Sequence, residues 1–304
     1  MCKVISIVNN KGGVGKTTST GFIAQLIACL GKKVLVVDLD QQSNLSMLLN
    51  CYVDDSDDVV NGITNASIPN IAELFKYRYR DTKDVVSLIM TTPVENLYII
   101  PSSKRHKNTV LNITANTTGN NNIILRRALA AIKDQYDYIL IDNAPANDIL
   151  TVNSMFASDM VLVPIRLEGF SHKGLQETLD TITYIKEEHD LEHLKFGGTF
   201  ITQAEKNTVI YKDLAESYEN MLESDFLKTA IRKDIKVCEL ESVFKPLLQY
   251  CPNSNVVYDY SKLILELNIL DEAANQKLAH AINLDLANFR CTECTSSLPT
   301  IQEV

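Results

Sequence analysis

A glycine-rich stretch near the start of the 304-residue chain has the residue types that bind phosphate. Its residues, in order, are Asn10, Lys11, Gly12, Gly13, Val14, Gly15, Lys16, Thr17 and Thr18. Glycines lack a Cβ, so the backbone can fold tightly and turn several N–H groups toward one anion. Lys16 supplies a cation for β- and γ-phosphates, and the Thr17 hydroxyl can bind Mg²⁺. The stretch therefore predicts a loop that binds a nucleoside triphosphate.

The segments on either side of this loop predict how it is positioned. The apolar run Val4 to Val8 comes before it and predicts a strand, and the run Phe22 to Leu30 after it predicts a helix. Strand, glycine-rich loop and helix together form the context that a P-loop requires. A helix that begins near Lys16 also directs the positive end of its dipole at the phosphates.

The loop departs from the usual P-loop pattern at its beginning. Asn10 stands where the pattern has glycine, and Lys11 is an additional lysine. Lys11 cannot easily reach its own nucleotide, because the loop surrounds the phosphates with backbone. It could instead reach a second nucleotide across a dimer interface. The alternative is that Lys11 is an ordinary solvated lysine.

Carboxylates follow two other predicted strands. The buried run Lys33 to Asp38 ends in Asp38, with Asp40 two residues later, and Tyr138 to Ile141 is followed by Asp142. Residues two apart on a strand share one side, and ligands bind at the carboxyl edge of parallel sheets. We therefore predict that Asp38 and Asp142 hold Mg²⁺ and that Asp40 acts at the phosphate. The alternative for Asp38 and Asp40 is that they cap a helix before Ser43.

The motif Lys-Gly-Gly-Val-Gly-Lys-Thr-Thr (11–18) resembles the deviant Walker A box of the ParA/MinD class of ATPases. Its surroundings, Asn9-Asn10 and Asp38 to Gln42, are most similar to the ParA (Soj-type) partition ATPases. The resemblance implies an α/β fold with a doubly wound, mainly parallel sheet. It also implies an ATPase switch for DNA partition, which dimerises with ATP, binds double-stranded DNA non-specifically and is stimulated by a ParB-like partner. Asp40 then orients the attacking water, and Lys16 and the partner's Lys11 supply charge.

The resemblance covers about residues 1–267 and leaves 268–304 as an additional helix and a polar tail. Within it, Met160 to Pro164 and the later Glu168, Phe170, Gly174 and Leu175 follow the family pattern. Residues 226–232 resemble the family's last strand, and this resemblance places Ile231 and Arg232 at the adenine pocket. The chain departs from the family at Gln41, where proline is usual, and at Asn143 to Ala146, where Thr-Pro-Pro-Ser is usual.

A small group of cations lies between residues 228 and 245 in a chain with a formal net charge of -9 and a pI near 5.1. In ParA-like proteins this region contributes to a DNA surface, so we predict a DNA-binding role here; ordinary solvated side chains are the alternative. A second basic cluster, Lys104 to Lys107, is the other candidate surface. The predicted DNA-binding residues are Lys228, Arg232, Lys233, Lys236 and Lys245.

Two rival functions belong to other classes. A MinD-like membrane switch needs a basic amphipathic C-terminal helix, whereas residues 271–303 carry mainly acidic charge. A reductase similar to the nitrogenase iron protein needs cysteines in the middle of the chain, and none lies between Cys51 and Cys238. Cys291 and Cys294 alone form half of a zinc site.

Other segments complete the expected organisation. No apolar run is long enough to span a membrane, and the strand that begins at Lys3 leaves no room for a preceding helix-turn-helix. We therefore expect a cytoplasmic, nucleoid-associated protein without stable membrane association. Strands are predicted at 97–100 and 197–202, helices at 71–76, 84–89, 123–132, 171–188, 206–222, 256–267 and 271–289, and a loop at 112–122.

Overall fold

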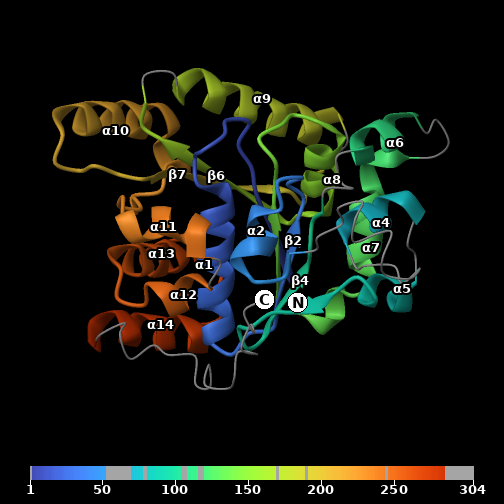
Figure 1. The fold of residues 1–304 in the computed structure, drawn as a ribbon. Coiled ribbons are helices and arrows are strands. Elements are labelled where there is room, and N and C mark those ends of the chain that lie inside the picture. Colours follow the sequence, from blue (N-terminus) through green and yellow to red (C-terminus); the bar gives the residue numbers. More distant parts are fainter. Residues whose placement is uncertain are drawn as a thin grey trace.

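The computed structural model describes residues 2–52, 70–77, 81–103, 108–115, 120–168, 171–188, 191–243 and 246–284. Within these residues the strands form one seven-stranded sheet with the order β3-β4-β2-β5-β1-β6-β7 (Figure 1). Only the β3–β4 pair is antiparallel. The predicted doubly wound, mainly parallel sheet is confirmed. The strands are β1 Lys3–Ile7, β2 Val34–Asp38, β3 Met90–Thr91, β4 Leu97–Ile100, β5 Tyr138–Asp142, β6 Met160–Arg166 and β7 Lys195–Thr202.

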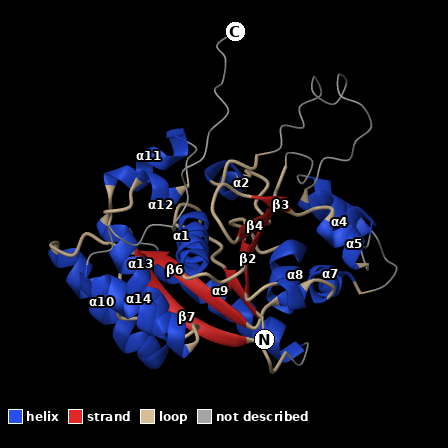
Figure 2. Cartoon of the chain, turned by 90° about the horizontal axis from the view of Figure 1, so that it is seen from below, coloured by secondary structure: helices blue, strands red, loops and turns tan. Residues whose placement is uncertain are grey.

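Helices cover both faces of this sheet, as Figure 2 shows. Successive residues of each central strand pack into different clusters, because side chains alternate across a strand. Val34 and Val36 of β2 pack with α1, for example, whereas Leu35 and Val37 pack with α7 on the opposite face. The α-helices are α1 Lys16–Cys29, α2 Asn44–Leu48, α4 Ile71–Tyr77, α5 Thr82–Val86, α6 Thr109–Ala115, α7 Ile124–Ala130, α8 Ile149–Ala157, α9 Ser171–Glu188, α10 Val209–Leu222, α11 Ile235–Val243, α12 Leu247–Tyr250, α13 Asn255–Glu266 and α14 Glu272–Leu284.

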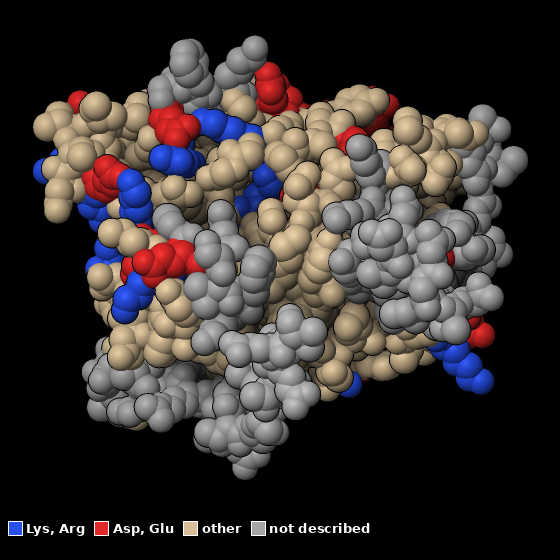
Figure 3. Space-filling view, in the orientation of Figure 1, with Lys and Arg blue, Asp and Glu red and all other residues tan. Residues whose placement is uncertain are grey.

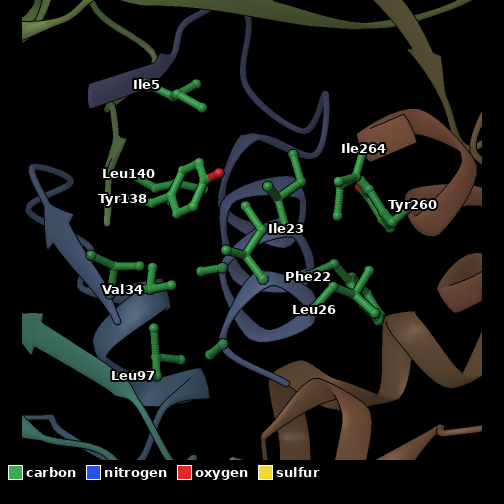
Figure 4. Packing of buried hydrophobic residues seen from close by; sticks show 14 of the residues in the cluster. Ile5, Phe22, Ile23, Leu26, Val34, Leu97, Tyr138, Leu140, Tyr260 and Ile264 are labelled. Carbon is green, nitrogen blue, oxygen red and sulfur yellow. The ribbon is translucent and has the colours of Figure 1, made fainter. Parts of the chain in front are cut away.

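The helix α1 lies inside the molecule, between the sheet and α13. Ile23 faces the sheet residues Tyr138 and Leu140, whereas Phe22 and Leu26 face Tyr260 of α13 (Figure 4). The rings of Phe22 and Tyr260 stack with centroids 5.0 Å apart, and the Tyr260 hydroxyl lies 2.7 Å from that of Ser19. A helix that is apolar on all sides is buried on all sides. The phosphate-binding end of α1 is therefore fixed to the core.

Several expected elements differ from those observed. Residues 226–232 do not form a strand; they make single bridges from Phe226 to Thr199 and from Arg232 to Ala204. The expected loop at 112–122 is wrong at its beginning, because α6 extends to Ala115. The helix expected at 84–89 begins and ends earlier, as α5. The basic cluster at 104–107, Lys245, Cys291 and Cys294 lie outside the described residues.

The C-terminal helix α14 packs on α13, where Ala274 and Leu278 enter the same core cluster as α1. Asp271, just before α14, pairs with Lys32. The division of the chain at residue 267 stays a prediction. None of the described helices is long and apolar enough to cross a membrane.

Candidate nucleotide-binding and catalytic site

The phosphate loop joins β1 to α1 at the carboxyl edge of the sheet. Gly13 and Gly15 have φ angles of 72° and 83°. Residues other than glycine rarely adopt this left-handed backbone conformation. Gly15 is also the N-cap of α1, and its carbonyl accepts a hydrogen bond from the Ser19 N–H at 2.8 Å. The backbone therefore has the shape that the glycine spacing predicts for an anion-binding loop.

Side chains from neighbouring strands hold this loop. The Asn9 Oδ1 accepts a bond from the Lys11 N–H at 2.8 Å, and its amide donates to the Pro164 carbonyl at the end of β6. From β7, the Thr202 hydroxyl donates to the Val14 carbonyl at 2.8 Å. The adjacent Gln203 donates through Nε2 to the Gly13 carbonyl at 3.1 Å. The loop is thus tied to β6 and to the end of β7, which lie on one side of β1.

A cavity of about 530 Å³ opens above the loop. The P-loop residues Gly12 and Gly15 to Thr18 line it, and Asp40 faces it from the end of β2. Lys16 is buried, and its Nζ donates to the Lys11 carbonyl at 3.0 Å. Burial lowers the pKa of Lys16, while the charges of Asp142 and Asp40 act in the opposite direction. A lysine bordered by these carboxylates and a row of backbone N–H groups can bind the phosphates of a nucleotide.

Asp40 and Asp38 have different surroundings, although they are two residues apart. Asp40 accepts the Gln42 N–H through Oδ1 at 2.9 Å and borders the cavity. Asp38 is fully buried, and both of its oxygens are bonded: Oδ1 by the Asp40 N–H, and Oδ2 by the N–H and hydroxyl of Ser46. The metal-binding role of Asp38 stays a prediction. Its contacts favour another role, which is to hold the turn that carries Asp40.

Asp142 lies beside Asp38, because the two are paired residues of the neighbouring strands β2 and β5. Its Oδ1 is 3.4 Å from the Thr20 hydroxyl, whereas Oδ2 is buried without a hydrogen-bond partner. The nearby Thr17 hydroxyl lowers the pKa of the Asp142 carboxyl group. A buried carboxylate oxygen without a partner, next to a threonine hydroxyl, fits the oxygen ligands that Mg²⁺ prefers. Asp142 and Thr17 are therefore the residues that would hold it.

Burial raises the pKa of both of these carboxyl groups. The pKa of Asp38 is raised to about 7, and that of Asp142 is raised well above its usual range by burial and by the nearby Asp38 charge. In the unfolded chain such groups titrate near pH 4. Above that pH the folded state holds protons that the unfolded state has lost. The free energy of unfolding should therefore decrease as the pH rises from about 4 through 7.

We expect Asp142→Asn to raise the melting temperature of the nucleotide-free chain at pH 8, by about 3–10 °C for a gain of about 1–3 kcal/mol. No donor of the described residues hydrogen-bonds Asp142 Oδ2, so an amide can replace the carboxylate there without a charge. The melting temperature, measured by calorimetry between pH 6 and pH 8, should also depend less on pH than in the wild type. Asp213→Asn on the exposed side of α10 is the control and should change neither quantity. An unchanged pH slope in Asp142→Asn would contradict the shifted titration.

The side chain of Lys11 does not line the cavity. Its Nζ lies 2.7 Å from Glu168 Oε2, and the other oxygen of Glu168 lies 2.9 Å from the Arg166 Nε at the end of β6. The sequence does not predict this pair. Lys16 thus lines the cavity of its own chain, whereas Lys11 of the same loop is directed toward Glu168 outside it.

Comparison with known proteins agrees with this geometry. Residues 2–195 match the family model described as an AAA domain. The sporulation initiation inhibitor protein Soj of Bacillus subtilis is 32% identical, over 88% of this chain and 98% of its own length. The chromosome-partitioning ATPase Soj of Treponema pallidum is 30% identical, over 88% and 97%. Among solved structures, a putative plasmid partition protein of Borrelia burgdorferi bound to AMPPNP is 26% identical, with a TM-score of 0.68, over 88% and 99%.

The chain belongs to the ParA/Soj family of partition ATPases. The family was predicted from the P-loop motif and its surroundings, and this prediction is confirmed. The chain is accordingly an ATPase of the ParA/Soj type.

A second, smaller cavity of about 90 Å³ adjoins the first through Gly15, Thr18 and Gln203. Ile231 and Arg232, which the resemblance places at the adenine, line it together with Tyr260 of α13. The Arg232 guanidinium makes two bonds of 2.8 Å to Asp259, and this contact raises its pKa. Contact with adenine stays a prediction, and Arg232 is in any case an anchor between the 226–232 segment and α13.

The predicted DNA-binding cations are not equivalent. Arg232 is paired with Asp259, and Lys233 with Glu205 at 2.6 Å. Lys228 and Lys236 are exposed, and among the described residues neither ammonium group forms an ion pair, although their N–H groups donate to Glu266 and Asp234. On the side of the molecule where α10 and α11 lie, basic and acidic side chains sit close together (Figure 3). The DNA-binding role stays a prediction, with Lys228 and Lys236 its best candidates.

The structure adds a residue that sequence reasoning missed. Gln203 borders both cavities and holds the P-loop, in a left-handed conformation with φ of 50°. Gln203 directly follows β7 at the carboxyl edge of the sheet, where ligands bind, and this position could have indicated its role from the sequence.

Proposed function

We propose that this chain is an ATP-dependent dimeric switch that partitions DNA, on a plasmid, a mobile element or a chromosome. In the ATP state two chains pair and bind double-stranded DNA without regard to sequence. A ParB-like DNA-binding partner then stimulates hydrolysis and separates them. Such a protein works in the cytoplasm, at the nucleoid. The observation that carries the proposal is the position of Lys11, which belongs to the P-loop but lies outside the cavity of its own chain.

The site accounts for hydrolysis by positioning and charge, which is what phosphoryl transfer needs. Lys16 binds the β- and γ-phosphate oxygens in its own chain, and Lys11 of the second chain adds charge from outside. Asp40 lies at the cavity wall with Oδ2 free of hydrogen bonds to described residues, so it can orient the attacking water. Mg²⁺, when held by Thr17 and Asp142, supplies further positive charge at the phosphates.

Support for the nucleotide comes from the relatives as well as from the cavity. The Borrelia partition protein was solved with AMPPNP, an ATP analogue, and the Treponema relative is named a chromosome-partitioning ATPase. The two cavities together offer a phosphate site on the P-loop and a partly apolar site beside Ile231 and Tyr260. These features suit a purine nucleotide with a triphosphate chain.

A DNA titration with and without nucleotide tests the proposal most directly. The wild-type chain is mixed with a fluorescent duplex of arbitrary sequence, with a non-hydrolysable ATP analogue, with ADP, or with neither. We expect binding only with the analogue, equally for duplexes of unrelated sequence, together with an ATP-dependent doubling of mass in light scattering. Equal DNA binding in all three conditions would contradict the switch.

Among single lysine variants, we expect Lys236→Ala and Lys228→Ala to weaken this binding more than Lys233→Ala. Lys233 already shares its charge with Glu205, so less of its charge is available to phosphate. Each DNA phosphate that a variant no longer neutralises should lower the slope of log affinity against log salt by about one unit, or about two per dimer. The measurement is the affinity for one duplex at several salt concentrations.

Lys277→Ala, an exposed lysine on α14, is the matched control and should leave the salt slope unchanged. If Lys228→Ala and Lys236→Ala also leave it unchanged, DNA binds elsewhere. The basic cluster at 104–107 is then the next candidate.

A further inference from the structure

The backbone at the start of the P-loop is held by hydrogen bonds to both the N–H and the carbonyl of Lys11. The Lys11 N–H is bound by Asn9, and its carbonyl is bound by Lys16. On the outer side, the Asn10 N–H reaches the Thr178 hydroxyl of α9 at 3.4 Å, and Gly174 lies beside the Lys11 Cβ. Two fixed backbone groups and a neighbouring helix leave the ammonium group as the part that can exchange partners.

In the single chain this ammonium group is occupied by Glu168. The Nζ–Oε2 distance is 2.7 Å, and the side chains of Lys11 and Glu168 are 32% and 40% exposed. Glu168 follows the end of β6, and the two residues are 157 positions apart in the sequence. The contact is therefore a feature of the folded chain and not of the loop alone.

Arg166 binds the second oxygen of the same carboxylate at 2.9 Å. One carboxylate thus serves two cations. If Lys11 leaves, Glu168 still has Arg166, so no unpaired negative charge remains beside an arriving phosphate. Breaking the Lys11–Glu168 ion pair therefore requires little free energy.

We propose that Glu168 holds Lys11 in the single chain and releases it to the phosphates of a second chain's nucleotide, and that Arg166 neutralises Glu168 after the release. The inference rests on the dimeric switch proposed above. A γ-phosphate carries more negative charge than a carboxylate that is shared with an arginine, so it draws the lysine away. The Lys11–Glu168 pair then sets the threshold for dimer formation, and Glu168 and Arg166 are positioning residues.

The two positioning residues should shift dimerisation in opposite directions. Glu168→Gln keeps the shape and removes the charge, so it should lower the dimer dissociation constant by about two- to fivefold, the scale of an exposed ion pair. Arg166→Gln removes the cation that competes with Lys11 for Glu168, so it should raise that constant. A merely structural role would weaken the dimer in both variants.

The measurement is analytical ultracentrifugation of the full chain with a non-hydrolysable ATP analogue and Mg²⁺. Asp271→Asn is the matched control, because it removes the carboxylate that pairs with Lys32 near α14, and it should leave the constant unchanged. A Glu168→Gln dimer that is equal to or weaker than the wild-type dimer overturns the proposal and leaves the switch standing. A wild-type chain that does not dimerise overturns the switch and this inference with it.

A second measurement tests the holding contact without any dimer. The nucleotide-free chain is treated briefly with an amine-acylating reagent, and the labelling of Lys11 is followed by peptide mass spectrometry relative to Lys277. Glu168→Gln should increase Lys11 labelling by about two- to fivefold and leave other lysines unchanged. Equal labelling in the variant and the wild type would show that Glu168 does not hold Lys11, and would overturn the proposal on its own.

Discussion

An Asp40→Ala chain is expected to bind ATP, form the dimer and remain in it, with hydrolysis reduced by about 10²- to 10³-fold. Asp40 borders the cavity, but it neither holds the P-loop nor contacts Lys16 or Thr17 through a hydrogen bond. Its loss therefore leaves the phosphate-binding groups in place. Without a group that orients the water, the γ-phosphate is not removed, and the expected ATP-bound dimer persists.

Phosphate release and light scattering on the same sample measure the two halves of this result. Lys16→Ala is the contrasting variant, because it removes the buried cation of the cavity, so ATP binds poorly and no dimer appears. Together the two variants separate binding from turnover. If Asp40→Ala hydrolyses ATP at nearly the wild-type rate, another group positions the water, and Asp142 is the next to test.

Lys11→Ala should bind nucleotide nearly as well as the wild type but lose ATP-dependent dimerisation. The Lys11 side chain does not line its own cavity, and what holds the loop is its backbone, which alanine keeps. Hydrolysis should decrease by about 10³-fold, as for a cation supplied by a second chain in related phosphoryl transfers. Equilibrium binding of a fluorescent ATP analogue and light scattering distinguish the two effects.

Lys277→Ala again provides the control, since it removes one exposed lysine far along the chain from the P-loop. It should dimerise and hydrolyse ATP as the wild type does. A Lys11→Ala chain that still forms an ATP-dependent dimer would refute the cross-subunit role of Lys11.

Sequence reasoning reached the elements whose pattern is local. The P-loop, the strand before it and the helix after it follow from glycine spacing and from two apolar runs, and all three are observed. Asp142 was found because a buried strand ends in a carboxylate at the edge where ligands bind. In each case a few consecutive residues determine both the structure and the chemistry.

What the sequence could not predict depends on contacts between distant residues. Glu168 belongs to the family pattern, but nothing local indicates that it binds Lys11. Spacing alone does not separate Asp38 from Asp40, whereas in the structure Ser46 binds Asp38 and Asp40 borders the cavity. Residues 226–232 resemble a strand in sequence but make only single bridges, because the N–H groups of Lys228, Thr229 and Arg232 donate to Glu266 and Asp259 of α13.

The bonds from Asn9, Thr202 and Gln203 to the P-loop have a consequence for the speed of nucleotide capture. A loop that is already ordered loses little conformational entropy when a ligand arrives, so more of the interaction energy appears as affinity. Association then needs no slow folding of the loop around the phosphates and approaches the rate of productive encounters. In the dimeric switch that we propose, nucleotide capture is then expected to be faster than the meeting of two loaded chains.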